Sequence, residues 1–386
     1  MKKQNKNVYF AGPPKKTALV LSGGGSRGAY QCGAWQALDE LGVKLDIVTG
    51  VSVGALNGVM VVQGDQIETA NLWRKLETDM VFDVESDAQM QDFAVEFLKN
   101  GGAGTEGLQS IIREYIDEDE LRKSPIDYGL LTVEFPAMKP HYKWLQDIPE
   151  GQLADYVTAS ASAFPALHPH EIDGKSYIDG GYENNLPVKM AVDRGATHII
   201  AVYLKAIGKF DPKELDTAEN ILFVEPKWDL GSFLIFDKKN TKRTMRLGYL
   251  DMMKALDVYD GDYYSFVKGE FDKKTVLMAD ACAKIFELNP LILYKKEIFM
   301  EEISRSIEEA REDISDKLDF RWRGPFKLEK IKDALETANK KTLVLVLAQF
   351  IADGDDDASR ILRSKSVQRL LKNELAAAKF IYRYSL

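Results

Sequence analysis

Apolar and polar positions in the first half of the chain follow two periods in turn, and this alternation predicts strands interleaved with helices. Short apolar runs at Thr17–Leu21 and Leu45–Thr49 indicate buried strands. After each run, at Gly28–Leu41 and Val53–Gln63, apolar side chains recur with the spacing of a helix. The pattern predicts an α/β fold, a three-layer sandwich in which helices cover both faces of a mainly parallel sheet. Later runs with the character of strands are Leu130–Glu134, Ser176–Ile178 and His198–Leu204.

The pattern changes after Ala206, where helical periodicity takes over. We therefore expect an N-terminal extension over residues 1–16, an α/β domain over 17–205, and a mostly helical C-terminal region over 206–386 that packs on it. The C-terminal segments that predict helices, each rich in Ala, Glu, Lys or Leu, are Glu301–Leu318, Lys327–Asn339, Leu343–Ile351 and Ala358–Phe380.

The residues Gly50-Val51-Ser52-Val53-Gly54 join the second predicted strand to the helix that follows it. A G-x-S-x-G sequence at a strand-to-helix turn is typical of a nucleophile elbow, which exposes a reactive serine on a sharp bend. Glycine on both sides lets the chain reverse tightly, and the helix N-terminus beside Ser52 favours negative charge. An ordinary Gly/Ser turn is the alternative when this motif is taken alone.

A second glycine-rich stretch, Ser22-Gly23-Gly24-Gly25-Ser26-Arg27-Gly28, follows the first predicted strand. Successive glycines leave backbone N–H groups unobstructed, which suits binding of an oxyanion or a phosphate. Gly23, Gly25 and Gly28 also match the dinucleotide fingerprint, but that fingerprint needs an acidic residue at the end of the second strand. Asp46 lies at the start of that strand instead, and no G-K-[ST] closes the loop, so the sequence disfavours a nucleotide site.

A serine nucleophile needs a base, and the chain offers one well-placed aspartate as well as histidines. Asp179 ends a short predicted strand and precedes Gly180 and Gly181, so its carboxylate would stand at a strand terminus with little cover. Burial can raise the pKa of such a carboxylate and let it accept a proton from serine, although Asp-Gly-Gly alone also fits an ordinary turn. The histidines, any of which leaves a Ser-Asp-His arrangement open, are His141, His168, His170 and His198.

Taken in order, the glycine loop, the serine elbow and the Asp-Gly-Gly turn resemble the motifs of the patatin-like phospholipases. The resemblance extends to Ala159–Pro165 and Asn184–Pro187, and covers roughly residues 17–205. It implies a patatin-like fold and a dyad in which Ser52 is the nucleophile and Asp179 the base, with neither metal nor cofactor. It assigns the elbow to Gly50 and Gly54, the Asp-Gly-Gly motif to Gly180 and Gly181, and the oxyanion hole to Gly23, Gly24, Gly25, Arg27 and Gly28.

The resemblance implies a lipid acyl hydrolase of the phospholipase A type, a serine esterase of lipid degradation that cleaves acyl esters of glycerophospholipids. Two alternatives stay open: a hydrolase of small esters or thioesters with the same dyad, and a regulated effector module whose C-terminal half binds a partner or ligand. The expected partners are phospholipid or another acyl ester, with transient contact with a membrane surface. The sequence leaves the oligomeric state open.

The net charge and the cysteine content limit which partners and which cellular compartment the sequence favours. The 386 residues carry 51 Lys and Arg against 60 Asp and Glu, a net charge of −9 at pH 7, which disfavours nucleic acid as a partner. Cys32 and Cys282 lie far apart in helical patterns, which indicates a reduced, cytoplasmic setting without a disulfide. We expect neither a signal peptide nor a membrane span, because no apolar run is long enough.

One segment of the second half has the composition of a lipid-contacting element. Trp228–Phe236 is rich in apolar and aromatic residues. An apolar stretch beside a basic cluster suits an interfacial element that lifts a lipid from a bilayer. A core segment followed by a solvated helix start fits the same residues. The basic residues that follow it are Lys238, Lys239, Lys242, Arg243 and Arg246.

Overall fold

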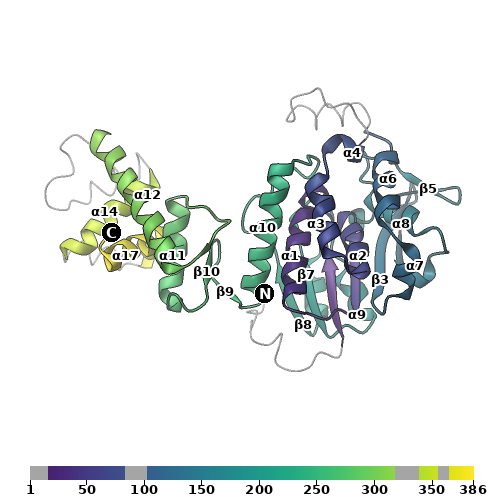
Figure 1. Cartoon of the computed structure of the whole chain (residues 1–386), viewed down its shortest axis with the longest axis horizontal. Helices are drawn as coiled ribbons and strands as arrows, with labels where there is room; N and C mark the ends of the chain where they lie inside the picture. Colours follow the sequence, from purple (N-terminus) through teal and green to yellow (C-terminus); the bar gives the residue numbers. More distant parts are fainter. Residues whose placement is uncertain (1–15, 83–101, 318–338, 355–364) are drawn as a thin grey trace. The chain divides into compact units, whose positions relative to one another are not determined.

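The computed structural model of the chain describes residues 16–82, 102–317, 339–354 and 365–386 (Figure 1). It forms two compact units, Met1–Leu256 and Asp257–Leu386. The division falls further along the chain than residue 205, where the sequence pattern places it. The segment after residue 205 supplies the first unit with a strand, β8 (Asn220–Val224), and a long helix, α10 (Lys238–Ala255).

A mostly parallel sheet forms the centre of the first unit. Its strand order is β5-β6-β3-β2-β1-β7-β8, with β4 paired to β3. Strands β1, β2, β3, β7 and β8 pair in parallel, whereas β4, β5 and β6 are antiparallel to their neighbours. The predicted α/β class with a mainly parallel sheet is confirmed. The strand bounds are β1 Thr17–Leu21, β2 Ile47–Val51, β3 Asp127–Phe135, β4 Lys139–Trp144, β5 His170–Ile172, β6 Lys175–Asp179 and β7 His198–Val202.

Helices cover both faces of this sheet. On one face, Ala18, Val20 and Ile47 pack against α9 (Val188–Asp193). On the other face, Val48 lies beneath α2 (Val53–Gln63). Every residue of β1 and β2 is buried, which explains why these strands read as largely apolar runs. The other helices of this unit are α1 Ala29–Glu40, α3 Gln66–Lys75, α4 Thr78–Phe82, α6 Glu106–Tyr115, α7 Glu118–Lys123 and α8 Leu153–Ala161, with 3-10 turns η1 Gly25–Gly28, η2 Leu145–Asp147, η3 Gly180–Tyr182 and η4 Pro212–Thr217.

Helices α1 and α10 cross at a pair of glycines. A Cβ on Gly33 would lie 1.8 Å from the carbonyl oxygen of Met245, and a Cβ on Gly248 would lie 2.0 Å from that of Tyr30. Only glycine permits so close an approach, because any side chain would overlap the opposite backbone. The buried hydroxyl of Tyr30 donates to Asp251 at 2.8 Å near the same crossing. Helix α10 is therefore an integral part of the first unit.

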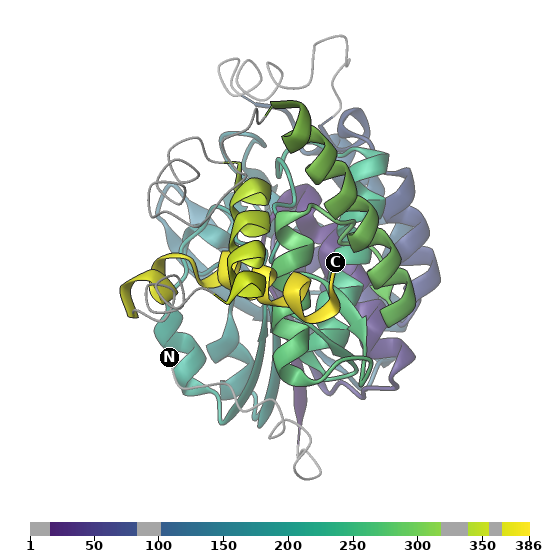
Figure 2. The ribbon, with the colours of Figure 1, turned by 90° about the vertical axis from the view of Figure 1, so that its left-hand side faces the viewer.

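The second unit is mostly helical, and its core is aromatic. Phe266, Phe299 and Phe380 are fully buried there, and their rings meet edge to face. A small sheet, β11-β10-β9, was not predicted, because strands of two or three residues leave no periodic pattern. The bounds are β9 Tyr259–Asp260, β10 Ser265–Val267, β11 Leu293–Tyr294, α11 Lys273–Ile285, α12 Lys296–Lys317, α14 Lys340–Asp353, α16 Lys365–Leu370 and α17 Lys372–Tyr384 (Figure 2, green to yellow).

The predicted C-terminal helices agree with these elements where they can be compared. The segment Glu301–Leu318 overlaps α12, and Leu343–Ile351 falls within α14. The segment Ala358–Phe380 begins outside the described residues and continues through α16 and α17. All but the last residue of Lys327–Asn339 lies outside the described residues. Among the helices that are described, none is long and apolar enough to span a membrane.

Candidate active site

Ser52 stands on a sharp bend between β2 and α2, at φ 56° and ψ −131°. The bend requires the flanking glycines. A Cβ on Gly50 would lie 2.1 Å from the carbonyl oxygen of Gly54, and a Cβ on Gly54 would lie 2.3 Å from that of Leu21. Few side chains tolerate a positive φ, and here the surrounding contacts impose it on the serine. The predicted elbow geometry is present, and it turns the Ser52 hydroxyl toward a cavity.

Ser160, on α8, fixes this bend from behind. The backbone N–H of Ser52 donates to Ser160 Oγ at 3.1 Å, and that hydroxyl donates in turn to the carbonyl oxygen of Leu131 on β3 at 2.7 Å. All three groups are buried. The elbow is thereby tied to a neighbouring helix and a neighbouring strand, so Ser52 cannot shift without breaking a buried hydrogen bond.

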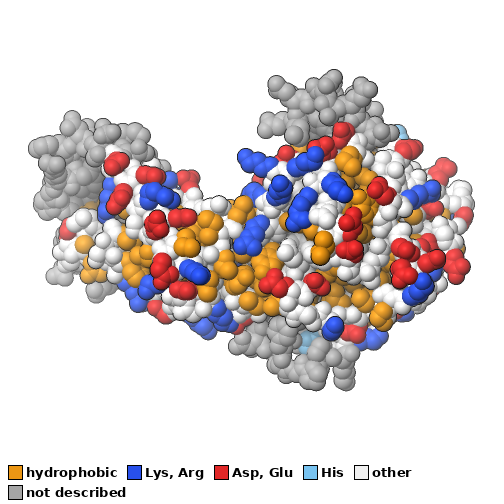
Figure 3. Space-filling view, viewed as in Figure 1, with side chains coloured by type: hydrophobic (Ala, Val, Ile, Leu, Met, Phe, Trp, Pro, Cys, Tyr) orange, Lys and Arg blue, Asp and Glu red, His pale blue; other side chains and the backbone are white. Residues whose placement is uncertain are grey.

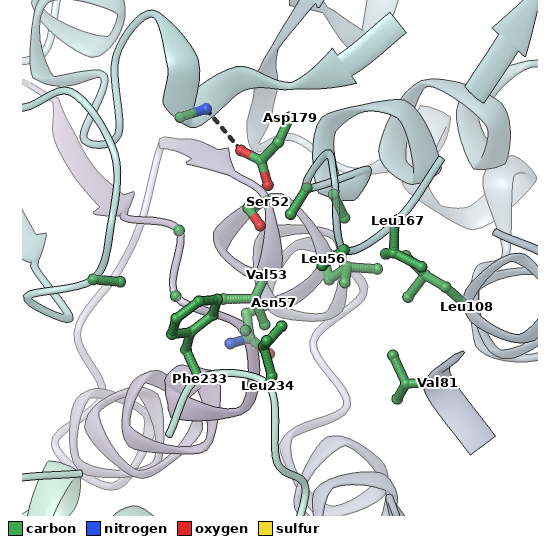
Figure 4. Close-up of a pocket in the computed structure, with 18 of the residues that line it drawn as sticks. Ser52, Val53, Leu56, Asn57, Val81, Leu108, Leu167, Asp179, Phe233 and Leu234 are labelled. Atoms are coloured by element: carbon green, nitrogen blue, oxygen red, sulfur yellow. Dashed lines mark hydrogen bonds between the residues drawn. The ribbon is translucent and has the colours of Figure 1, made fainter. Parts of the chain in front are cut away.

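Asp179 is the last residue of β6, and against the rise caused by burial the Ser52 hydroxyl beside it lowers the pKa of its carboxyl group. Its Oδ1 also accepts from the N–H of Gly181 at 2.7 Å, the bond dashed in Figure 4, where the carboxylate lies beside the Ser52 hydroxyl. Burial raises the pKa of Asp179 to about 6, while the bonds from Ser52 and Gly181 hold it back. At neutral pH this carboxylate is mainly ionised yet far more basic than an exposed aspartate.

The glycine loop predicted to form the oxyanion hole contains two kinds of residue: some have N–H groups without an acceptor among the described residues, and others contact neighbouring segments. The N–H groups of Gly24 and Gly25 have no acceptor in the described part of the chain. Both residues line the cavity beside Ser52. A pair of backbone donors aimed at the same space as a serine hydroxyl can stabilise a developing oxyanion.

The other predicted members of the hole hold the loop instead. The N–H of Gly23 donates to Asn185 Oδ1 at 3.1 Å, so it is already engaged. Arg27 points its guanidinium away from the cavity, with Nε donating to the carbonyl oxygen of Gly231 at 2.9 Å and a terminal nitrogen donating to that of Lys205 at 2.9 Å. Gly28 packs against Trp73 and Val53. Gly23 also lines the cavity, and the assignment of Gly23, Arg27 and Gly28 to the oxyanion hole stays a prediction.

No histidine is among the described residues that line the cavity. His170 bridges Thr105 and Asp155, at 3.2 Å to each, and His141 contacts Glu134 at 3.0 Å. His198 opens β7 and contacts Thr197 at 3.1 Å. The rings of His170 and His141 tie separate segments together, and the described cavity wall gives the Ser-Asp-His alternative no support.

Behind Ser52 extends a cavity of about 650 Å³ with an almost wholly apolar wall. Its wall is built from α2, α3, α4, α6 and the segments around residues 164–167 and 233–236. Cavities of this size and character bind apolar ligands that are oriented by a few polar groups. The lining residues labelled in Figure 4 with apolar side chains are Val53, Leu56, Val81, Leu108, Leu167, Phe233 and Leu234.

The end of the segment Trp228–Phe236 forms part of this cavity wall. Leu234 and Phe236 are 6% and 8% exposed, and both line the cavity. The Phe236 ring stacks on Trp73 with centroids 6.2 Å apart. An interfacial role for these two side chains is wrong, because they face inward; the core alternative holds for them.

Sequence reasoning gave no role to Asn185, which joins three segments at the site. Besides accepting from Gly23, it packs against Gly181 and Gly208, where a Cβ would approach its amide oxygen and its Cγ to 2.9 and 2.7 Å. Its own N–H donates to the carbonyl oxygen of Lys209 at 2.7 Å. The motif Asn184–Pro187 marked the place, but only the tertiary contacts reveal what Asn185 does.

Part of the chain is similar to proteins of one known family. Residues 19–192 match the family model described as patatin-like phospholipase. The neuropathy target esterase sws of Drosophila melanogaster is 27% identical over 277 residues, covering 67% of this chain and 18% of that protein. The human patatin-like phospholipase domain-containing protein 6 is 30% identical over 266 residues, covering 64% of this chain and 18% of that protein. The chain thus spans less than a fifth of the length of these relatives.

Among solved structures, the crystal structure of VipD from Legionella pneumophila is similar at a TM-score of 0.40 and 15% identity, covering 96% of this chain and 91% of that one. Residues 19–192 of the chain are thus similar to patatin-like phospholipases.

Proposed function

We propose that this chain is a phospholipase A-type acyl hydrolase in which Ser52 is the nucleophile and Asp179 its base. The observation that carries the proposal is the position of the buried Asp179 carboxylate beside the buried Ser52 hydroxyl, at the end of an apolar cavity (Figure 4). Nucleophile and base within hydrogen-bond reach, beside free backbone donors, make up the machinery of acyl transfer.

In the first step, Ser52 Oγ attacks the ester carbonyl carbon of the lipid while Asp179 takes the hydroxyl proton. The carbonyl oxygen becomes an oxyanion, which the N–H groups of Gly24 and Gly25 stabilise. As the tetrahedral intermediate collapses, the carbon–oxygen bond to the glycerol breaks. The proton on Asp179 passes to the departing alcohol, which leaves as a lysophospholipid. The acyl group stays on Ser52.

In the second step, a water molecule gives a proton to Asp179 and attacks the acyl-serine. The same two N–H groups stabilise the second oxyanion. Collapse breaks the bond to Ser52 Oγ, which recovers its proton from Asp179, and the fatty acid leaves. A pKa of about 6 suits both directions of proton transfer, since the carboxylate is ionised at neutral pH but readily protonated.

The cavity wall supports a long acyl chain as the group transferred. Leu56 is near Ser52, whereas Val81 and Leu108 lie further along the cavity (Figure 4). Burying each methylene of a chain there contributes about 0.8 kcal/mol. A soluble short-chain ester would leave most of this wall without a partner. A thioester with a long acyl chain would fill the cavity equally, so the assay must distinguish oxygen esters from thioesters.

The test is labelling of the full chain with a fluorophosphonate, together with assays on phosphatidylcholine vesicles, a long-chain acyl thioester and a nitrophenyl butyrate. We expect the adduct on Ser52, and loss of labelling and turnover in Ser52→Ala. Asp179→Asn should lose turnover by about 10⁴-fold. Ser110→Ala, a change at an exposed serine of α6, is the matched control and should behave like the parent.

Two results would overturn parts of the proposal. An adduct on Ser22, Ser26 or Ser162 would remove Ser52 as the nucleophile. Hydrolysis of the thioester without hydrolysis of phosphatidylcholine would make the chain a thioesterase with the same dyad.

A further inference from the structure

A surface of concentrated positive charge lies on the first unit, in a chain whose net charge is −9. It is visible in Figure 3 as blue side chains gathered where α3 and α10 lie. Its members come from the last turn of α3 and the first turns of α10, and all but the half-buried Arg243 are exposed. This basic patch comprises Arg74, Lys75, Lys238, Lys239, Lys242 and Arg243.

The basic patch is the outer side of the cavity wall. Leu76 lines the cavity directly after Lys75, and Phe236 lines it two residues before Lys238. The two segments are joined, since the N–H of Phe236 donates to Thr78 Oγ1 at 2.9 Å. The same short stretches of chain therefore present apolar side chains to the cavity and basic side chains to solvent.

Structural stability does not explain the lysines of α10. The first turn of a helix favours acidic side chains, because it carries the positive end of the helix dipole. In α10 this turn has no acidic residue and begins with Lys238 and Lys239. Only the N-cap Asp237 offsets them within the helix, by accepting from the N–H of Asn240 at 2.6 Å.

Few of these charges are neutralised by neighbours. Among the described residues, Lys238 is the only member of the basic patch with an acidic partner, Glu77. Asp79 is exposed nearby on α4. Among the described residues of this surface, basic side chains outnumber acidic ones, and violations of local preference of this kind mark functional positions.

We propose that the basic patch docks the enzyme on an anionic lipid bilayer, with the cavity wall facing the membrane. The inference rests on the proposed function, because it names where the acyl-ester substrate is met. The remainder of the chain is acidic and is repelled by such a bilayer, so the charge distribution orients the molecule as well as attracting it. Each basic side chain at an anionic surface raises partitioning roughly fivefold.

The test measures co-sedimentation of the full chain with vesicles of phosphatidylcholine alone and of phosphatidylcholine mixed equally with phosphatidylserine. The variant Lys239→Gln with Lys242→Gln removes two exposed charges and keeps the pair of Lys238 with Glu77. The matched control, Lys44→Gln with Lys123→Gln, removes two exposed lysines near the amino ends of β2 and β3, at the opposite edge of the sheet from Ser52.

We expect the parent and the control to bind the phosphatidylserine vesicles, with binding that weakens as salt is added. The patch variant should bind at least about tenfold more weakly at an unchanged melting temperature. Binding is scored separately from hydrolysis. Absence of phospholipid hydrolysis alone would therefore refute the proposed function and leave this result standing.

Three outcomes would overturn the docking proposal. The first is equal weakening in patch and control variants, which would assign binding to overall charge. The second is equal binding to both kinds of vesicle. The third is no vesicle binding by the parent together with patch-dependent binding of polyglutamate, which would assign the basic patch to an acidic protein.

Discussion

At the scale of single residues, the site depends on how deeply one carboxylate is buried. Asp179 is 7% exposed, and among the described residues no basic side chain supports its charge. Burial therefore dominates its pKa, and only the donors Ser52 and Gly181 oppose the shift. The same burial that disfavours the anion makes it a usable base for a serine hydroxyl.

This balance predicts the pH dependence of activity. Asp179 must be ionised to accept the Ser52 proton, and its pKa lies at about 6. The value of kcat/KM on a soluble ester should rise with pH through that value and level off above it, with protonation removing the base below it. The profile is measured between about pH 5 and 8.

Histidine titrates in the same range, so the control is made at the histidines. His170→Gln and His141→Gln should keep the acidic limb at the same pH, because these rings bridge secondary-structure elements away from Ser52. An acidic limb that disappears in either variant would assign the titration to that histidine and remove Asp179 as the base.

Asn185 gives a second prediction at this scale. Replacing it by alanine removes the side-chain acceptor of the Gly23 N–H, which keeps only its 3.3 Å bond to the backbone carbonyl oxygen of residue 185, and so loosens the loop that carries Gly24 and Gly25. We expect kcat to fall by about 10²-fold, the size of losing one oxyanion donor, with a smaller change in KM. Steady-state kinetics on the short ester measure both constants.

The neighbouring Asn184→Ala is the matched control. Asn184 is also buried, but its amide group bonds to Glu214 and to the N–H of Leu186, away from the glycine loop. It should lower the melting temperature while leaving kcat within about threefold of the parent. Equal losses of kcat in the two variants would show that Asn185 acts only on stability.

The sequence predicted the dyad residues but not their support, and the reason is distance along the chain. Ser52 follows β2 and Asp179 ends β6, and each belongs to a local motif that can be recognised by itself. Asn185 acts on Gly23 across 162 positions, and Ser160 acts on Ser52 across 108. The motifs that contain Ser160 and Asn185 mark these positions but not their partners, which only the folded arrangement of strands reveals.

At the scale of elements, local periodicity predicted the buried strands and helices near the start of the chain best. The strands β1, β2 and β7 and the helices α1 and α2 follow their predicted runs closely. The strand β8 was missed, because Asn220–Val224 lies at the sheet edge and three of its five residues are only partly buried. The sequence allows two interpretations of the segment 233–236, because apolar residues give the same pattern whether they face a cavity or a membrane.

The far end of the cavity yields a prediction about chain length. Val81, on α4, is 5% exposed and lies across the cavity from Ser52 (Figure 4). Val81→Trp should fill that end and leave the space next to Ser52 open. Hydrolysis of long-chain esters should fall by about tenfold relative to butyrate esters, because several methylenes lose their site.

Ile67→Trp, at a side chain that is 73% exposed on α3, adds the same ring without entering the cavity. It should leave the ratio of long-chain to short-chain rates unchanged. Equal loss on both esters in Val81→Trp would mean that the ring disturbs the site as a whole, and an unchanged ratio would mean that the acyl chain runs elsewhere.

At the scale of the whole molecule, the division of the chain decides what can fold alone. The composition changes after residue 205, and the sequence places the boundary there. Composition indicates whether a segment forms helices or strands, but not which hydrophobic core those elements pack against. The segment beyond residue 205 adds β8 to the sheet, Phe236 to the cavity wall and α10 to α1, and all three are needed by the first unit.

This argument predicts the behaviour of two fragments. Residues 1–256 should unfold in a single cooperative transition and react with the fluorophosphonate at Ser52, since they contain the whole sheet and cavity wall. Residues 1–205 should fail on both counts, because α1 would expose the face that Gly33 turns to α10 and the cavity would lack the wall of residues 233–236. Circular dichroism during heating and labelling by mass spectrometry measure the two properties. A shorter fragment that melts cooperatively and is labelled like the full chain would return the boundary to residue 205, whereas failure of the longer fragment would show that the first unit depends on residues 257–386 to fold.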